Sequence, residues 1–405
     1  MKRKEIHLKL SFFLSCLIAF FLPVYNYFVP TLIVISVINW FFEGNFADKL
    51  KRLKSNFFVK LFTLFYLLYI VGLLWTENIN VGLLDILLKL SIFIFPVIYA
   101  SFEGFYNEKK YSAIFSSFVL GCLITTIYCL AHAYYLWHLT GENYFMYSRL
   151  SMFMHPSYFA MYLTLAMSIL LYKIYSRPSF SRIDIFNLLL IFWFWFFIIQ
   201  LQSKAGIIIS ALVFVIFAVL FIISKRKYLQ VIITLFLLFG GYYLSNRFLI
   251  TSGNSRMFNA EYNIVKAKID TTTAESNQVR ILIWKASWDI FKENYLYGVG
   301  TGDIKSELDK MYLKRNMIGA HENHLNAHNQ YIQSALGFGI LGLALLILVF
   351  LLPFIYSVAE KKYLYALFLI IIGLNFCIES MLETQAGVMF FAFFNTLFFL
   401  ELKRK

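Results

Sequence analysis

Long apolar stretches separated by polar connections run through most of this 405-residue chain. A helix needs about 20 mostly apolar residues to cross a bilayer, and twelve stretches of the sequence meet that requirement. Their centres lie near residues 17, 35, 66, 91, 125, 164, 193, 214, 237, 344, 371 and 393. Because backbone polar groups in lipid must pair within the protein, this pattern predicts an all-α integral membrane protein of about twelve transmembrane helices.

One connection, between the ninth and tenth predicted helices, is much longer than the others. Residues 246–330 contain 11 Lys and Arg and 9 Asp and Glu, a composition typical of a globular, water-exposed segment. We therefore expect transmembrane helices 1–9 in residues 1–245, a compact cap in residues 246–330 and helices 10–12 in residues 331–405. Within the cap, residues 279–293 have apolar side chains at helical spacing. This indicates an amphipathic helix that either lies on the outer leaflet or packs inside the cap.

The composition is typical of a membrane protein, and the distribution of Lys and Arg along the chain indicates its topology. Apolar residues make up 60% of the chain and charged residues only 14%, which is too apolar for a soluble protein. The net charge of +14 would suggest a nucleic-acid partner in a soluble protein, but here the two ends and alternate connections carry 22 Lys and Arg. The short connections on the other side carry only Arg149 and Lys204. The positive-inside rule predicts cytoplasmic termini, an extracytoplasmic cap and no nucleic-acid partner.

A histidine precedes the tenth predicted helix. His328 is followed by Asn329, near which that helix begins, so free N–H groups and the positive end of the helix dipole should lie beside the imidazole. Such an end attracts phosphate, and a neutral imidazole there could serve as general base on a hydroxyl group. A lone histidine at a membrane interface is also commonly a structural hydrogen-bonding group, and spacing alone leaves both interpretations open.

Two blocks of the sequence resemble the O-antigen ligase family, whose members transfer undecaprenyl-linked glycans onto an acceptor. The first block is Tyr297-Gly298-Val299-Gly300-Thr301-Gly302-Asp303, and the second is His328-Asn329, nine further residues and Gly339-Ile340-Leu341-Gly342. The resemblance implies that His328 is the catalytic residue of an inverting glycosyltransferase. It also implies an undecaprenyl-diphosphate glycan as donor, the lipid A core of lipopolysaccharide as acceptor, and a bacterial inner membrane location with the site facing the periplasm. No cofactor is expected.

A diphosphate leaving group requires cations or a metal where negative charge develops. Relatives have an arginine after a serine at the outer end of a membrane helix, whereas this chain has Lys204 after Ser203. Lysine keeps the charge but loses the bidentate fork, so donor pyrophosphate binding by Lys204 stands beside a simpler role as interfacial anchor. Arg280 resembles a loop arginine of the family and is the second expected pyrophosphate ligand. Arg247 and Arg256 could substitute for it, and a solvated face is the alternative for all three.

Other polar residues could support this site. Glu379 lies in a segment between the last two helices that resembles one in bacterial members of the family, and it could orient His328 or bind acceptor sugar, with an exposed turn as the alternative. His324 and Asn329 are further candidates. His321, His324 and His328 have helical spacing and could mimic a three-histidine metal site. Asn323 and Asn326 are turn formers that interrupt that segment, and the first outer connection has no acidic residue, so we expect no metal.

Two further patterns favour structural roles. Asp85 and Lys89 lie one helical turn apart on the fourth predicted helix, which favours a neutralised pair or an interface anchor. The segment from Gly298 to Gly302 could cradle phosphate through exposed N–H groups, but it lacks the strand-turn-helix context of known phosphate loops. A glycine turn is therefore the favoured interpretation.

Related functions remain compatible with the pattern. An O-antigen polymerase, whose acceptor is a second lipid-linked glycan, and a protein O-oligosaccharyltransferase are the nearest alternatives. Outside the enzymes, a transporter of the lipid-linked glycan would place paired charges near the bilayer midplane between broken repeats. In this sequence the polar residues gather on the outer side, which favours an enzyme.

Overall fold

The protein is described here by a computed structural model, which covers residues 2–102, 107–225 and 277–402 together with scattered positions between 228 and 243. Within these residues the regular structure is entirely helical, so the predicted all-α membrane fold is confirmed. Ten of the described helices or helix pairs are long and apolar enough to cross a membrane, and the apolar helix Tyr363–Phe376 is shorter. The predicted ninth span, near residue 237, lies largely outside the described residues.

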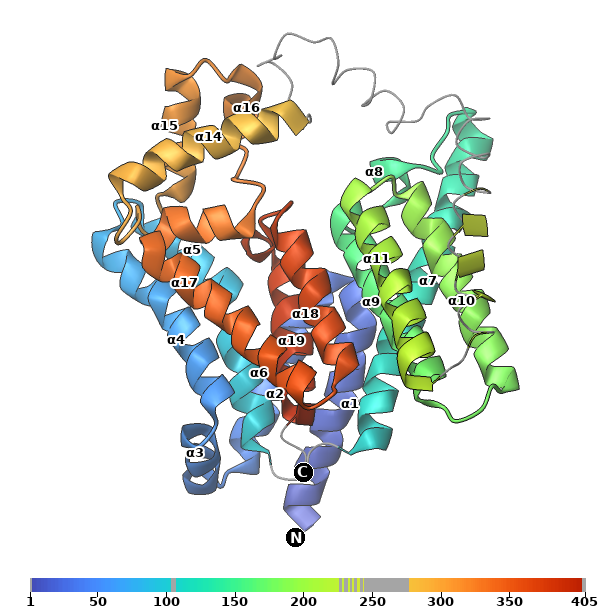
Figure 1. Cartoon of the computed structure of the whole chain (residues 1–405). Helices are drawn as coiled ribbons and strands as arrows, with labels where there is room; N and C mark the ends of the chain where they lie inside the picture. Colours follow the sequence, from blue (N-terminus) through green and yellow to red (C-terminus); the bar gives the residue numbers. More distant parts are fainter. Residues whose placement is uncertain are drawn as a thin grey trace. The chain divides into compact units, whose positions relative to one another are not determined.

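The chain divides into two compact units, and Figure 1 labels helices of both. The first unit comprises residues 1–43 and 104–265, and the second comprises residues 44–103 and 266–405. The described helices of the first unit are α1 (Lys2–Val24), η1 (Asn26–Phe28), α2 (Val29–Glu43), α7 (Glu108–Thr140), α8 (Tyr147–Leu150), α9 (Pro156–Ser176), α10 (Arg182–Gln200), α11 (Lys204–Leu220) and η3 (Phe221–Lys225). Those of the second unit are α3 (Phe46–Lys54), α4 (Phe57–Val71), η2 (Gly72–Trp75), α5 (Ile79–Lys89), α6 (Ser91–Ser101), α14 (Asn277–Glu293), α15 (Ile304–Lys314), α16 (Ile318–Glu322), α17 (Gln330–Ala359), α18 (Tyr363–Phe376), η4 (Met381–Glu383) and α19 (Gln385–Leu402).

In the first unit, α9 is the most deeply buried helix and packs against both α10 and α11. Small side chains allow the close approach of α11, since a Cβ added at Gly206 would lie 2.4 Å from the Cβ of Ala160. The hydroxyls of Thr164 and Ser210 are 2.7 Å apart and join the same two helices. These contacts fix α11, whose first residue is Lys204, within its own unit.

In the second unit, α17 is bent where its backbone leaves the helical conformation at Phe338 and Gly339. The N–H groups of Val299 and Gly300 donate to the carbonyls of Leu336 and Gly337, at 2.8 and 3.0 Å. After the bend, the N–H of Ile340 donates to the carbonyl of Tyr295 at 2.8 Å. The backbone groups that the bend frees are therefore paired with the preceding loop, which satisfies their need for partners in an apolar surrounding.

The contact between this loop and α17 leaves no room for a side chain at Gly298. Its φ is +69°, and an added Cβ would lie 2.3 Å from the carbonyl carbon of Gly337. Gly141 in the first unit has a similar φ of +71° but has nothing within 4 Å of the added Cβ. We expect Gly141→Ala to lower the free energy of unfolding by about 1 kcal/mol, from backbone strain alone. Gly298→Ala should lower it by about 2–5 kcal/mol because overpacking adds to the strain.

Thermal unfolding of the two purified variants in detergent, followed by size-exclusion chromatography, would separate these effects. Similar losses in the two variants would show that the close approach at Gly298 is not a source of stability.

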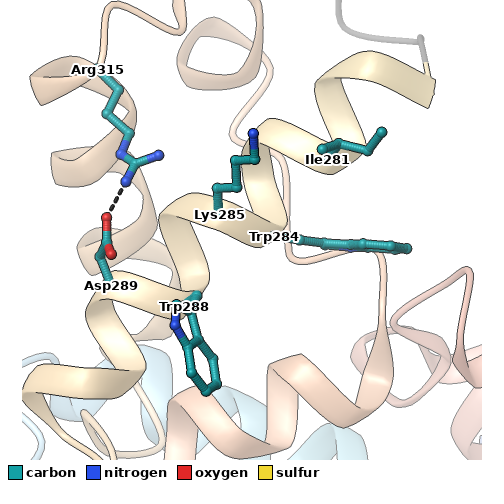
Figure 2. Close-up of a pocket in the computed structure, with 6 residues that line it drawn as sticks. All are labelled: Ile281, Trp284, Lys285, Trp288, Asp289 and Arg315. Carbon is teal, nitrogen blue, oxygen red and sulfur yellow. Dashed lines mark hydrogen bonds and ion pairs between the residues drawn. The ribbon is translucent and has the colours of Figure 1, made fainter.

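The described part of the predicted cap is a helical layer with an apolar core of its own. One face of α14 packs against α15, α16 and the start of α17 through buried side chains, namely Val279, Ile283, Ala286, Ile290, Leu308, Tyr312, Ala320 and Leu336. The sequence left open whether this amphipathic helix packs inside the cap, and the structure shows that it does. Its remaining face carries Ile281 and Trp288, both exposed (Figure 2).

Candidate functional site

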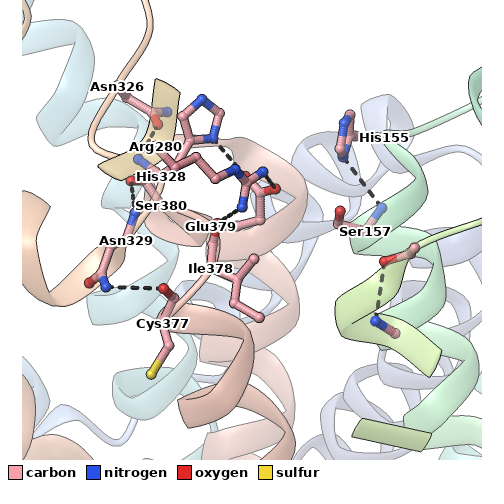
Figure 3. A network of polar contacts seen from close by, with 12 residues as sticks. His155, Ser157, Arg280, Asn326, His328, Asn329, Cys377, Ile378, Glu379 and Ser380 are labelled. Carbon is pink, nitrogen blue, oxygen red and sulfur yellow. Dashed lines mark hydrogen bonds and ion pairs between the residues drawn. The ribbon is translucent and has the colours of Figure 1, made fainter. Parts of the chain in front are cut away.

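His328 lies directly before the N-cap of α17 in a backbone conformation that few residues favour. Its φ is +45°, which lies in the left-handed region and costs free energy for a residue with a Cβ. Its N–H donates to Oδ1 of Asn326 at 2.9 Å, and its ring Nδ1 lies 3.2 Å from Oε2 of Glu379 (Figure 3). The side chain is 22% exposed. The imidazole is therefore held at Nδ1 and remains accessible to solvent.

The carboxylate of Glu379 determines which ring nitrogen is basic. An ionised carboxylate can only accept hydrogen bonds, so Nδ1 of His328 carries the proton that Glu379 accepts. The lone pair then lies on Nε2, on the opposite side of the ring. A carboxylate that fixes the tautomer and orientation of an imidazole is the arrangement that a histidine base requires.

Arg280 of α14 binds the same carboxylate. Its Nη2 lies 2.8 Å from Oε1 of Glu379, and its Nη1 donates to the carbonyl of Ile378 at 2.6 Å (Figure 3). A guanidinium has five N–H donors, so these two contacts leave others with which the partly exposed side chain could bind an anion. The structure thus brings Arg280, His328 and Glu379 together from three separate segments of the second unit.

Glu379 is buried, and three influences act on its pKa. Burial favours the neutral carboxyl and raises the pKa, but the hydrogen bond from His328 and the positive charge of Arg280 outweigh burial and lower the pKa below its ordinary value of 4.5. Glu379 is therefore a carboxylate at neutral pH and can accept from both partners.

This lowered pKa predicts a pH dependence of stability. Because the folded-state pKa lies below the unfolded one, the carboxylate of Glu379 stabilises the fold fully above about pH 4.5, and this contribution is lost as the pH falls through the lower folded pKa. We expect the difference in melting temperature between the wild type and Glu379→Gln to be largest near neutral pH and to shrink below pH 4.5. A difference that grows toward low pH would contradict an ionised Glu379.

Asn329 closes the start of α17 and joins it to the segment that carries Glu379. Its Oδ1 accepts from the N–H groups of Tyr331 and Ile332 at 2.9 and 3.1 Å, as an N-cap residue does. Its Nδ2 donates to the carbonyl of Cys377, and its own N–H donates to the hydroxyl of Ser380. The helix begins where the sequence predicts, but two of its first N–H groups are bound by Asn329 and are not free for phosphate.

The segment that carries Glu379 is also held in place beyond that residue, by a buried network of ion pairs. The predicted pair of Asp85 and Lys89 is confirmed, and the amino group of Lys89 also lies 3.3 Å from Oε1 of Glu383. The side chain of Lys89 is fully buried, with its amino group 4.9 Å from the centre of the Tyr69 ring. Since an unpaired buried charge costs several kcal/mol, the network strongly favours one position for the residues that follow Glu379.

The three histidines that could have formed a metal site do not share a common partner. Nδ1 of His324 lies 2.7 Å from the carboxylate of Asp309, and Nδ1 of His321 lies 4.0 Å from it, whereas His328 is bound to Glu379. Among the residues that the structure describes, no group of three or more His, Cys, Asp or Glu side chains could hold a metal ion. The three-histidine arrangement is therefore not formed, and His324 pairs within the cap.

The glycine block is a structural turn, as the sequence favours. The N–H groups of Val299 and Gly300 are bound by α17, and that of Gly302 donates to the hydroxyl of Thr76 at 3.3 Å. The carboxylate of Asp303 accepts from the N–H of Glu77 at 2.7 Å, close to the start of α5. Because protein acceptors occupy these N–H groups, the block does not offer them to a phosphate.

Of the remaining predicted cations, one belongs to the first unit and two are outside the described residues. Lys204 is exposed at the first position of α11, where the hydroxyl of Ser203 accepts from the N–H of Gly206 at 3.2 Å. It belongs to the first unit, whereas His328 belongs to the second. Arg247 and Arg256 lie outside the described residues.

Three further polar contacts around the start of α17 were also not predicted from the sequence. Asn326 was interpreted only as a turn former, although an asparagine two residues before a backbone N–H commonly binds it, and this signal could have pointed to its bond with His328. Ser380 binds the N–H of Asn329, and Oε1 of Gln330 accepts from the N–H of Leu382 at 2.7 Å. Nothing in a single sequence indicates these two long-range contacts.

The fold and the site together define a multi-pass helical membrane protein in which a carboxylate and an arginine flank a histidine at the start of a helix. Comparison with protein families adds an observation that is independent of this geometry. The O-antigen ligase family model matches residues 188–347, so the chain carries a domain of the O-antigen ligase family, as the two sequence blocks indicate. This match includes Lys204, Arg280 and His328 but ends before Glu379. A search of curated proteins found no match.

The family match supports a membrane glycosyltransferase of the O-antigen ligase or polymerase type. It also implies a lipid-linked glycan and membrane lipid as partners.

Proposed function

We propose that the protein is an inverting, metal-independent glycosyltransferase that moves a glycan from undecaprenyl diphosphate to an acceptor hydroxyl, with the lipid A core of lipopolysaccharide as acceptor. The observation that carries this proposal is the histidine whose Nδ1 is held by the buried carboxylate of Glu379, which leaves Nε2 basic. The family match supports the substrate class. Lys89, a fully buried cation, is neutralised within a structural network, which favours an enzyme over a transporter.

In the proposed reaction, Nε2 of His328 takes the proton of the acceptor hydroxyl as its oxygen attacks the anomeric carbon of the donor sugar. The bond between that carbon and the phosphate oxygen breaks, and undecaprenyl diphosphate departs with the bonding electrons. A single displacement inverts the anomeric configuration. Glu379 stabilises the imidazolium that forms, and the positive charges of Arg280 and Lys204 stabilise the departing diphosphate. Asn329 keeps His328 at the start of α17.

We further propose an inner-membrane location with cytoplasmic termini and with residues 246–330 as a periplasmic cap. The support is the distribution of cations, with 22 Lys and Arg in the cytoplasmic segments and two in the short outer connections. An active site near His328 then faces the periplasm, where Arg256 and His324 are further candidates for contacts with the substrates.

Reconstitution of the purified protein tests the function. The donor is the undecaprenyl-diphosphate glycan of the same bacterium, and the acceptors, supplied separately, are the lipid A core, a second lipid-linked glycan and a protein. Transfer to the core supports a ligase, whereas transfer only to the second glycan or to protein identifies a polymerase or an oligosaccharyltransferase. Activity should persist in excess EDTA. Flipping of the donor without any transfer product would instead identify a transporter.

Lys204→Arg provides a test of the second proposed phosphate ligand. Arginine has the bidentate fork that suits phosphate oxygens, so we expect transfer at or above the wild-type rate. Lys204→Ala should weaken donor binding by about 5- to 100-fold, because a charge-assisted hydrogen bond contributes about 1.5–3 kcal/mol. Donor binding and single-turnover transfer are measured on the same samples. Unchanged donor binding in Lys204→Ala would leave Lys204 only the role of an interfacial anchor.

A further inference from the structure

The exposed face of α14 lines an open groove. Ile281 and Trp288 are 51% and 59% exposed, and Lys285 lies on the same face one turn from each of them. Together with Trp284, Asp289 and Arg315, these residues line about 460 Å³ that is open to solvent on one side (Figure 2), a volume within the usual range of ligand sites. The core of the cap does not require this apolar face, since α14 already packs through its opposite face.

The aromatic part of the groove is a fixed flat surface. The ring of Trp288 stacks on that of Phe291, with centroids 5.4 Å apart and an angle of 28° between the planes. Pyranose rings have apolar C–H faces and polar edges, so they can stack on an indole while their hydroxyls bind neighbouring polar groups. Indole combines a large contact area with little conformational freedom, which suits a ligand of this kind better than a flexible aliphatic chain.

The polar part of the groove supplies fixed donors and a fixed acceptor. Asp289 is bound by Arg315 and by Lys292, whose amino group lies 2.8 Å from it, and the hydrogen bond from Lys292 lowers the pKa of Asp289. The ionised carboxylate can accept from sugar hydroxyls, and the guanidinium can donate to them. Two cations, Lys285 and Arg315, line the groove beside this one acid, and Lys292 binds the acid from outside the lining. This excess of positive charge favours an anionic sugar. The same cations would attract the phosphates of lipid head groups, so a lipid surface is the competing occupant that the experiment must exclude.

Trp284 connects this groove to the candidate catalytic histidine. Its Nε1 donates to the carbonyl of Ala327 at 3.0 Å, and Ala327 immediately precedes His328. Arg280, which binds Glu379, lies one turn before Trp284 on the same helix. A sugar chain in the groove would therefore be separated from the site by little more than one indole ring.

We propose that the groove on α14 is a saccharide subsite, which holds acidic sugar rings of the glycan that reacts at His328. This proposal rests on the proposed transfer reaction. Both the donor glycan and a core oligosaccharide acceptor contain pyranose rings, and the experiment separates the two sources.

Direct binding to the full-length protein in nanodiscs tests the subsite. One probe is the lipid-free oligosaccharide released by mild acid from the lipid-linked glycans of the same bacterium, and the other is the delipidated core oligosaccharide of its lipopolysaccharide. We expect saturable binding of at least one probe by saturation-transfer NMR, and about tenfold weaker binding in Trp288→Ala, since loss of aromatic contact costs about 1.4 kcal/mol. The probe that loses affinity identifies whether the groove takes donor or acceptor sugar.

A control variant makes the result specific. Tyr295→Ala removes another exposed aromatic of the same layer, 56% exposed and outside the groove, and should bind as the wild type does. Binding of the lipid-free probes does not require transfer, so a failure of the proposed chemistry would not resemble a failure of the subsite. Binding of neither probe by the wild type, or equal binding by Trp288→Ala, would overturn the proposal. Quenching of Trp288 fluorescence by brominated lipid, judged against Trp288→Phe, would overturn it in favour of a membrane contact.

Discussion

Replacing His328 with alanine is expected to reduce transfer by about 10²- to 10⁴-fold, the usual contribution of a general base, and to leave donor binding nearly unchanged. The reason is that Nε2 is the nitrogen left basic once Nδ1 is held by Glu379. In the proposed mechanism this nitrogen contacts the acceptor hydroxyl, not the diphosphate. The loss should therefore fall on the rate of the chemical step in single-turnover measurements.

His328→Asn is the matched variant for this experiment. The left-handed φ of +45° at this position strains alanine, whereas asparagine adopts that conformation more readily. If both variants lose transfer and His328→Asn keeps the wild-type melting temperature, the loss comes from chemistry and not from unfolding. Near-normal turnover in either variant would rule out general-base catalysis by His328, and His324 and Glu379 would be the next candidates.

Glu379→Gln is expected to reduce the turnover rate by about 10- to 100-fold, with little change in substrate binding. Partners that orient a functional histidine typically contribute this much. Glutamine has nearly the same shape, but it carries no charge to stabilise the imidazolium or to balance Arg280, and its amide can present a donor to either partner. The measurement is single-turnover transfer at saturating donor and acceptor.

Glu383→Gln is the control in the same segment. Glu383 pairs with the buried Lys89 and not with His328, so its loss should lower thermal stability while the folded fraction keeps most of its turnover rate. Equal losses of turnover in the two variants would indicate that Glu379 acts only by holding the segment in place.

The membrane helices could be predicted because length and hydropathy alone decide whether a segment can cross a bilayer. The start of α17 was also predictable, since Asn329 is a good N-cap residue directly before an apolar run. The bend in the same helix was not predicted, although Gly339 is visible in the sequence. Glycine tolerates a left-handed conformation without requiring it. The bend becomes favourable because backbone donors and acceptors between Tyr295 and Gly300 pair with the groups that it frees.

The candidate site could be predicted only in part, for a related reason. His328 and Arg280 lie in parts of the sequence that resemble the O-antigen ligase family, so each could be predicted as a site residue without the other. Their common partner, Glu379, lies far along the chain from both, and an acidic residue near a helix end is compatible with many roles. The ion pair between Asp85 and Lys89 could be predicted from helical spacing. The second ion pair of Lys89, with Glu383, depends on tertiary packing alone.

The part of α17 that precedes the bend is held at both of its ends. This explains why nine residues separate Asn329 from Gly339. At one end Asn329 is tied to Cys377 and Ser380, and at the other Gly337 is tied to Gly300. One residue more or fewer would rotate one end by about 100° and shift it by about 1.5 Å relative to the other. His328 would then turn away from its carboxylate, or the bend would lose its partners. The spacing in the sequence is thus a measure of helical register between two anchors.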